Sequence, residues 1–187
     1  MIHRHRRRPC VVWKQDDVDP EAERVADTEG FEEFYTATVG RLLGALFPVT
    51  GDLHEAEEVV QEAYARASTR WARLRDYDVP EAWVRRVAMN LAADRGRRLQ
   101  RQARALLRAG PPAHVPPASV EAMALAEALR SLPMHQRQAI VLHHLVDLPV
   151  EEVAATLGAR TGTVKSWLAR GRRTLATQLG DPEEVRS

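Results

Sequence analysis

The side chains best suited to binding chemistry lie near the C-terminal end, on a helix expected from about Thr161 to Leu175. On a helical wheel, apolar residues occupy one side of this helix and the basic residues occupy the opposite side. The apolar side comprises Val164, Trp167, Leu168, Gly171 and Leu175, and the opposite side comprises Lys165, Ser166, Ala169, Arg170 and Arg173. Ammonium and guanidinium groups can donate hydrogen bonds to guanine O6 and N7 or to phosphate. The basic side therefore predicts a surface that binds DNA.

The residues before this helix predict a second helix packed against it. A helix expected to begin at Val150 ends near Leu157, and Gly158 supplies the turn. A helix-turn-helix needs a small residue where its helices touch, here Ala154, a glycine free to adopt positive φ, and an apolar anchor such as Val164. Its second helix can then lie in a major groove. An ordinary helical hairpin with a polar surface is the alternative that the pattern leaves open.

An arginine-rich helix expected to begin at Pro80 provides a second candidate surface. Residues 81–108 contain eight arginines against only Glu81 and Asp94. The candidate surface, called the arginine face below, comprises Trp83, Arg86, Asn90, Arg97, Arg98 and Arg101, while Val84, Val87, Ala88, Leu91, Ala92 and Leu99 lie on the opposite side. Arginine binds phosphate through paired donors, an aromatic ring stacks an unpaired base, and an amide reads a base edge. The set favours nucleic-acid binding, with a core tryptophan and a solvated basic side as the alternative.

A third set is acidic and lies on an expected helix from residue 52 to about residue 71. Asp52 occupies an N-cap position with Glu55 three residues later, which is the capping-box spacing. The set, called the acidic helix below, comprises Asp52, Glu55, Glu58, Gln61 and Glu62. Carboxylates at three- and four-residue spacing destabilise a helix unless a basic group answers them. A protein partner and a solvated acidic surface are both compatible with this pattern.

The elements that position these sets predict an all-α chain of two small helical domains joined by a flexible proline-rich linker. The 187 residues (21.0 kDa) are rich in helix formers, and neither strand-type alternation nor an internal repeat stands out. We expect a disordered arm at 1–29, a first helical domain at 30–108, a linker at 109–118, a helix-turn-helix domain at 119–180 and a tail at 181–187. In the first domain, apolar spacing from Phe31 is interrupted at Pro48 and Gly51.

Composition excludes several classes of protein. No apolar run approaches the roughly 18 residues of a membrane span, so we expect no membrane insertion. The lone Cys10 cannot form an internal disulfide, and the basic start lacks the apolar stretch of a secretory signal, which favours the cytoplasm. We predict no enzyme activity and no cofactor, because the sequence offers neither a phosphate-binding loop nor a catalytic triad. The adjacent His143 and His144 point to different helix faces, so we also predict no metal site.

The three sets, in this order, carry a family resemblance. The segment Glu57–Ala63 resembles a core-polymerase-binding helix, and Ala82–Asp94 resembles a helix that melts the −10 element of a promoter. The segments Leu132–Gln138, Leu157–Gly158 and Gly162–Ser166 resemble a unit that reads the −35 element. Over about residues 31–179, the chain resembles an extracytoplasmic-function sigma factor of the sigma-70 family.

The resemblance implies a function for each set. The acidic helix would bind the clamp coiled coil of core RNA polymerase, and the polymerase flap would be a further contact of the chain. The arginine face would bind the −10 element as single-stranded DNA. The residues that would read the duplex −35 element, called the recognition face below, are Arg160, Thr161, Thr163, Lys165, Ser166, Ala169, Arg170 and Arg173. An anti-sigma factor would hold the protein inactive.

Three departures from the family pattern concern the helix-turn-helix. Pro149 replaces the usual Ser or Thr cap, which a first helical turn tolerates. Arg160 and Thr161 replace a more common Ser-containing helix start, and Ala169 stands where a bulkier contact residue is frequent, so the number of bases read directly is left open. A rival function is an autonomous helix-turn-helix regulator that uses residues 31–108 as a protein-interaction module.

Overall fold

The computed structural model describes residues 30–106, 125 and 127–179, and within these ranges the regular structure is helical. The expected arm at 1–29, linker at 109–118 and tail at 181–187 lie outside the described residues. The helices of the N-terminal half are α1 (Phe31–Thr50), α2 (Leu53–Ser68), α3 (Trp71–Leu74) and α4 (Pro80–Leu106). Those of the C-terminal half are α6 (Met134–Ile140), the π-helical turn η1 (Val141–Leu145), α7 (Val150–Leu157) and α8 (Thr161–Leu179). The predicted all-α architecture is confirmed.

Local signals in the sequence explain how α1 ends and α2 begins. Gly51 adopts φ 73°, and its N–H donates to the Phe47 carbonyl at 2.8 Å, which closes the last turn of α1. The Asp52 carboxylate then accepts from the Glu55 N–H at 2.9 Å, which caps α2 as predicted. Pro48 lies inside the last turn of α1 and does not end the helix, since proline there removes a single backbone donor.

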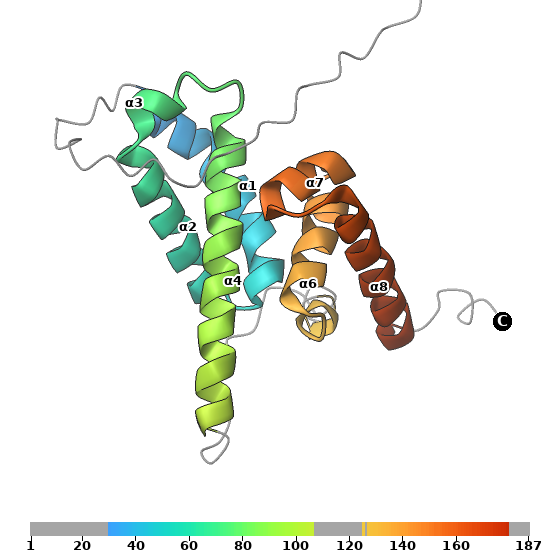
Figure 1. Ribbon diagram of the computed structural model, residues 1–187. Coiled ribbons are helices and arrows are strands. Elements are labelled where there is room, and N and C mark those ends of the chain that lie inside the picture. The colour runs from blue at the N-terminus through green and yellow to red at the C-terminus, as the bar shows by residue number, and fades with distance from the viewer. Residues whose placement is uncertain (1–29, 107–124, 126, 180–187) are drawn as a thin grey trace, which may run out of the picture.

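The first unit is built around α4, which packs against α1 and α2 (Figure 1). Leu46, Val59 and Val84 come from these three helices and are fully buried together. At one end, the Trp71 ring stacks on Phe34 with centroids 4.9 Å apart. Burial of these side chains supplies the main force that holds the three helices together.

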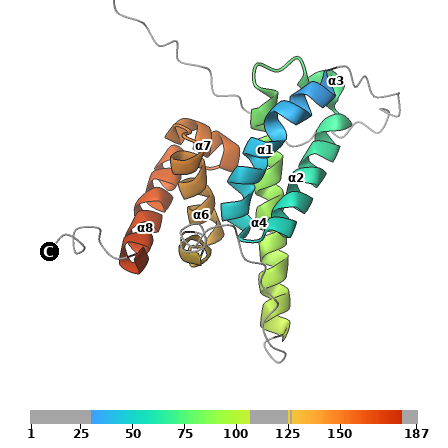
Figure 2. The same cartoon turned by 180° about the vertical axis from the view of Figure 1, so that it is seen from behind.

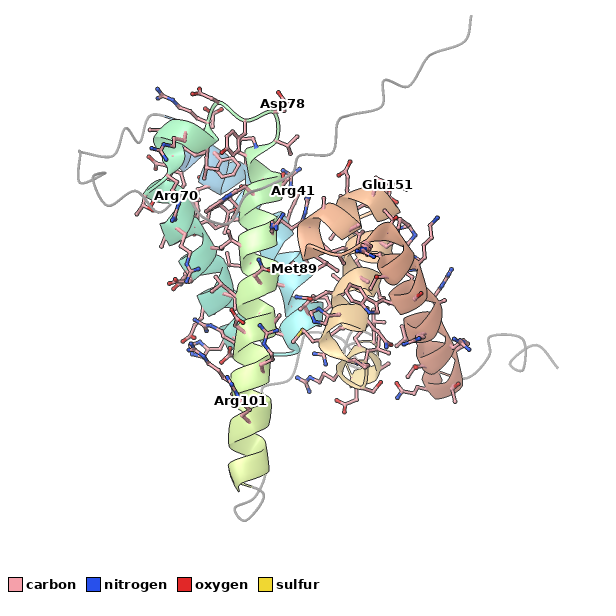
Figure 3. All side chains as sticks on the ribbon, in the orientation of Figure 1. Arg41, Arg70, Asp78, Met89, Arg101 and Glu151 are labelled. Carbon is pink, nitrogen blue, oxygen red and sulfur yellow. The ribbon has the colours of Figure 1, made fainter. Side chains whose placement is uncertain are left out.

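Two expectations for this unit were wrong in detail. The helix expected over 52–71 is divided, because α2 ends at Ser68 and Trp71 begins the separate short helix α3. Leu99, expected on the buried side of α4, is 50% exposed. The end of α4 that carries Arg101 extends beyond the other helices (Figure 3), and Leu99 lies two residues before Arg101.

The second unit contains the predicted helix-turn-helix. Leu142, Val153 and Val164 come from η1, α7 and α8 and are fully buried. A Cβ at Gly171 of α8 would lie 3.0 Å from Ile140 Cγ1, so a residue without a side chain lets α8 approach α6 closely. The small residue therefore sets the distance between the two helices.

The two units pack against each other and share one buried apolar cluster. The contact joins α1 and α4 to α6, η1 and α7, and both ribbon views show the units side by side (Figures 1 and 2). Met89 lies on the side of α4 that faces the second unit (Figure 3). Its backbone carbonyl accepts a hydrogen bond from Gln138 Nε2 at 2.6 Å.

Candidate nucleic-acid interface

The turn between α7 and α8 has the geometry that the sequence predicts. Gly158 adopts φ 62°, and the Ala159 N–H donates to the Ala154 carbonyl at 2.9 Å, which ends α7. Val164 and Leu168 of α8 are buried against the rest of the unit. These contacts fix the orientation of α8 about its own axis.

An aromatic contact adds a further support for α8. The Trp167 ring stacks on His135 of α6, with centroids 5.1 Å apart and an interplanar angle of 12°. The Trp167 side chain is half-buried, as expected for a residue at the edge of the apolar side. The stack ties the middle of α8 to the helix behind it.

The recognition face is entirely exposed. Its members are Arg160, Thr161, Thr163, Lys165, Ser166, Ala169, Arg170 and Arg173. The Ser166 hydroxyl donates to the Gly162 carbonyl at 3.0 Å, which leaves its oxygen able to accept a further bond. One side of a well-anchored helix thus presents several basic groups to solvent, which is the arrangement that major-groove binding needs.

The arginine face is divided between exposed and covered residues. Asn90, Arg97, Arg98 and Arg101 are exposed, and Arg101 lies on the end of α4 that extends from the bundle (Figure 3). Arg97 forms an ion pair with Asp94 one turn earlier. These four residues share the outer surface of α4.

Trp83 and Arg86 are half-buried and already have partners. The guanidinium of Arg70 lies over the Trp83 ring, with Arg70 Cζ 5.9 Å from the ring centroid. Arg86 Nη1 donates to the Ala155 carbonyl of α7 at 3.2 Å. The structure therefore places the upper part of the arginine face against other elements of the chain.

The carboxylates of the acidic helix are answered by arginines of the same chain. Arg95 of α4 forms ion pairs with Glu58 and, at 3.5 Å, with Glu55. Burial alone would lower the pKa of Arg95. The hydrogen bonds and charges of Glu58 and Glu55 outweigh that effect, and the pKa is raised above its ordinary value. Arg66 pairs with Glu62 at 2.8 Å, and Gln61 is exposed. The spacing of the carboxylates does not by itself require an external basic partner.

Several residues of the contact surfaces were missed by the sequence analysis. They are Arg70 over Trp83, Arg85 and Arg95 of α4, and Arg137 and Gln138 of α6. A run of arginines at 66, 70, 73 and 75 was a visible signal for the first of these. The other four depend on which helix lies opposite, and a helical wheel carries no information on that.

Within the described ranges, no three His, Cys, Asp or Glu side chains gather as a metal site would need. His143 Nδ1 is 2.8 Å from the Leu148 carbonyl, which fits a structural hydrogen bond that closes the turn before α7. No helix of the described part combines the length and apolar composition required to cross a bilayer.

Comparisons with known proteins agree on one family. The family models for sigma-70 region 2 and sigma-70 region 4 match residues 34–102 and 122–175. The RNA polymerase sigma-E factor of Streptomyces coelicolor is 31% identical over 151 residues, which cover 80% of this chain and 85% of that protein. The ECF RNA polymerase sigma factor SigE of Mycolicibacterium smegmatis is 30% identical over 188 residues, with 89% and 71% covered.

Solved structures share the fold over most of the chain. The sigma factor RpoE of Bartonella quintana, crystallised with the anti-sigma factor NepR, gives a TM-score of 0.64 at 22% identity and covers 82% of this chain and 99% of its own. CnrH, solved in complex with the cytosolic domain of CnrY, gives a TM-score of 0.57 at 26% identity and covers 86% and 92%. Each likeness extends over both units.

Proposed function

The chain belongs to the extracytoplasmic-function class of sigma-70 RNA polymerase sigma factors, and we propose that it contacts both elements of a promoter with its two basic surfaces. The recognition face of α8 reads the −35 element as duplex DNA, and the arginine face of α4 opens the −10 element and holds its displaced strand. The protein acts as a binding subunit, because the chemistry of RNA synthesis belongs to core polymerase.

The recognition face carries the −35 part of this proposal. Its eight residues are all exposed, seven on α8 and Arg160 directly before it, and the opposite side of α8 is buried, so the basic groups can enter a groove without unfolding the unit. Lys165 and Arg170 supply donors for guanine or phosphate, and the Ser166 oxygen can accept a hydrogen bond. Ala169 leaves room for close approach of the helix to the DNA.

Core polymerase is the protein partner in this proposal, and the acidic helix supplies the contact. Glu55 and Glu58 are already paired with Arg95, so basic groups of the polymerase clamp would share or replace that arginine. Exposed Gln61 offers an amide beside these carboxylates. An anti-sigma factor is a second partner, by analogy with the complex of RpoE and the anti-sigma factor NepR.

Transcription from a random promoter library tests the function. Purified protein and core RNA polymerase transcribe the library, and the promoters that yield transcripts are sequenced. We expect two enriched blocks at a fixed spacing, and no enrichment when either protein is left out. An autonomous regulator would bind duplex DNA tightly without polymerase and would not convert core polymerase to specific initiation.

Variants then assign each surface to its element. Lys165→Ala with Arg170→Ala should reduce transcription by removing −35 contacts while core binding stays unchanged. Arg172→Ala is the matched control, because Arg172 lies on the same helix and its charge acts on His144 of η1. Loss of core binding in the double variant would contradict this division of labour.

A further inference from the structure

The seam between the two units covers part of the surface proposed to bind the −10 strand. Arg86 is a member of the arginine face, yet its Nη1 donates to the Ala155 carbonyl of α7 at 3.2 Å. Helix α7, which opens the helix-turn-helix, packs directly on α4. In this arrangement the unit proposed to read the −35 element covers Arg86, which is proposed to hold the −10 strand.

A buried arginine of the second unit joins the end of α1 to residues 130–132 of its own unit. Arg137 is 8% exposed, and its Nη1 donates to the Val49 carbonyl of α1 at 2.7 Å. Its Nη2 donates to the carbonyls of Arg130 and Leu132 at 2.7 and 3.2 Å. The last carbonyls of a helix lack partners within the helix, and the last turn of α1 holds no basic residue. Arg137 therefore supplies from the other unit the donor that the end of α1 lacks.

The neighbouring glutamine makes a second bond across the seam. Gln138 is 1% exposed, and its Nε2 donates to the Met89 carbonyl in the middle of α4 at 2.6 Å. The bond lies where Met89 faces the second unit (Figure 3). A buried amide of this kind is costly to leave without a partner, so it favours one docking position over others.

The interface between the units also buries the guanidinium groups of Arg137 and Arg85, which would be better solvated in water. Nε of Arg137 and Nε of Arg85 are both buried without a hydrogen-bond partner. Burial lowers the pKa of Arg85 in spite of the charges of Glu81 and of Glu152 on α7, and burial with the charge of Arg130 lowers the pKa of Arg137. Desolvation of these guanidinium groups opposes the closed arrangement. A few hydrogen bonds thus hold the two units together, although separating the units would let water solvate the two buried guanidinium groups.

We propose that Arg137 and Gln138 form a latch that keeps the free protein closed, with the helix-turn-helix unit covering Arg86 until a binding partner separates the units. The closed form accordingly binds single-stranded DNA more weakly than an open form would. The latch itself is a property of the fold, and only its effect on DNA rests on the proposed function.

Gln138→Glu tests the latch directly. In the closed form the new carboxylate would be buried against the Met89 carbonyl without a donor, whereas in an open form it would be solvated. Gln136→Glu is the matched control, because it adds the same charge to the same helix at a position that is only half-buried. Both changes are made in a full-length chain with Cys10→Ser and spin labels at cysteines replacing the exposed Ala65 of α2 and Ala176 of α8.

Distances between the two labels report opening. We expect one narrow distribution for the parent and for Gln136→Glu, and a broad, longer distribution for Gln138→Glu. Arg86→Glu, which sets a carboxylate against the Ala155 carbonyl from the α4 side, should open the seam without touching the core of the second unit. Circular dichroism checks that each variant is folded. A broad distance distribution in the parent, or narrow distributions in both Gln138→Glu and Arg86→Glu, would overturn the latch.

Anisotropy of a fluorescein-labelled, random-sequence single-stranded 20-mer tests the effect on DNA. We expect Gln138→Glu to bind at least tenfold more tightly than the parent in spite of its added negative charge, and Gln136→Glu to match the parent or bind slightly less. Opening without any gain in affinity would overturn the inhibitory role of the latch. Failure of the proposed function itself would show separately, as absence of transcription from the promoter library.

Discussion

Two glycines with the same backbone conformation offer a sharp test of how the units are packed. Gly51 and Gly158 both end helices with left-handed φ, 73° and 62°. An alanine in this conformation costs roughly 1–2 kcal/mol of folding free energy at either position. Their surroundings differ, because a Cβ at Gly51 would overlap Arg130 Nε and lie 3.0 Å from Arg130 Cγ, whereas a Cβ at Gly158 meets Arg86 Nη2 only at 3.8 Å.

The difference in surroundings sets the expected difference in stability. Overpacking in a rigid core adds about 1–3 kcal/mol, but the Arg130 side chain is flexible and 29% exposed, so the low end of that range applies; Gly51→Ala should cost about 2–3 kcal/mol and Gly158→Ala about 1–2 kcal/mol. Any change in the entropy of the unfolded chain is the same for both substitutions and cancels in the comparison. The excess belongs to the contact between Gly51 of the first unit and Arg130 of the second.

Urea unfolding followed by far-UV circular dichroism measures both costs. The same substitutions are then made in an Arg130→Ala background, where the cost of Gly51→Ala should fall to that of Gly158→Ala. The double-mutant cycle removes the separate contribution of the Arg130 side chain. Equal costs for the two glycines in the parent background would refute the packing of Arg130 on the turn after α1.

Three smaller perturbations test other contacts. Thr38→Val removes the buried hydroxyl that lies 2.7 Å from Tyr64 Oη, so urea unfolding should show a loss of about 1–3 kcal/mol that Tyr64→Phe largely recovers. Arg95→Ala should cost at most about 1 kcal/mol, less in high salt, since its ion pairs to the acidic helix are partly exposed. By NMR, the pKa of His144 should lie below its usual value of about 6.5, because partial desolvation of its ring, His143 and the charge of Arg172 all lower the pKa, and Arg172→Ala should raise it. The unfolded chain then binds this proton more readily, so stability from this residue is present above the unfolded pKa and is lost as pH falls through the folded one.

The helix-turn-helix was predictable because its information is local. The apolar side of α8 repeats at helical spacing, and α7 supplies the partner only a few residues away. Val164 and Leu168 are therefore buried, and Lys165 and Arg170 are exposed, as the wheel indicates. Glycine at 158 marked the turn for the same reason, since a left-handed residue is needed at that point.

The seam was not predictable because a helical wheel gives the direction of a side chain and not what lies there. Arg86 and Arg97 occupy one sector of α4, yet Arg86 meets α7 while Arg97 faces solvent. The bond from Arg86 to Ala155 and the bond from Arg137 to Val49 join residues far apart in the sequence. Such contacts depend on the relative position of two units, which apolar periodicity within each unit does not encode.

The acidic helix shows that an inference about partners can be wrong when the side chains contributed by neighbouring helices are not known. Unanswered carboxylates suggested an external basic protein, but Arg95 approaches Glu55 and Glu58 from α4. A polymerase contact at this helix must therefore compete with an internal ion pair, and because exposed pairs contribute about 1 kcal/mol or less, the competition is easily won. Arg95 lies on the helix that also carries the arginine face, so releasing it from Glu55 and Glu58 would leave its positive charge unneutralised on α4. Coupling between the two surfaces then follows from electrostatics alone, without a change in backbone structure.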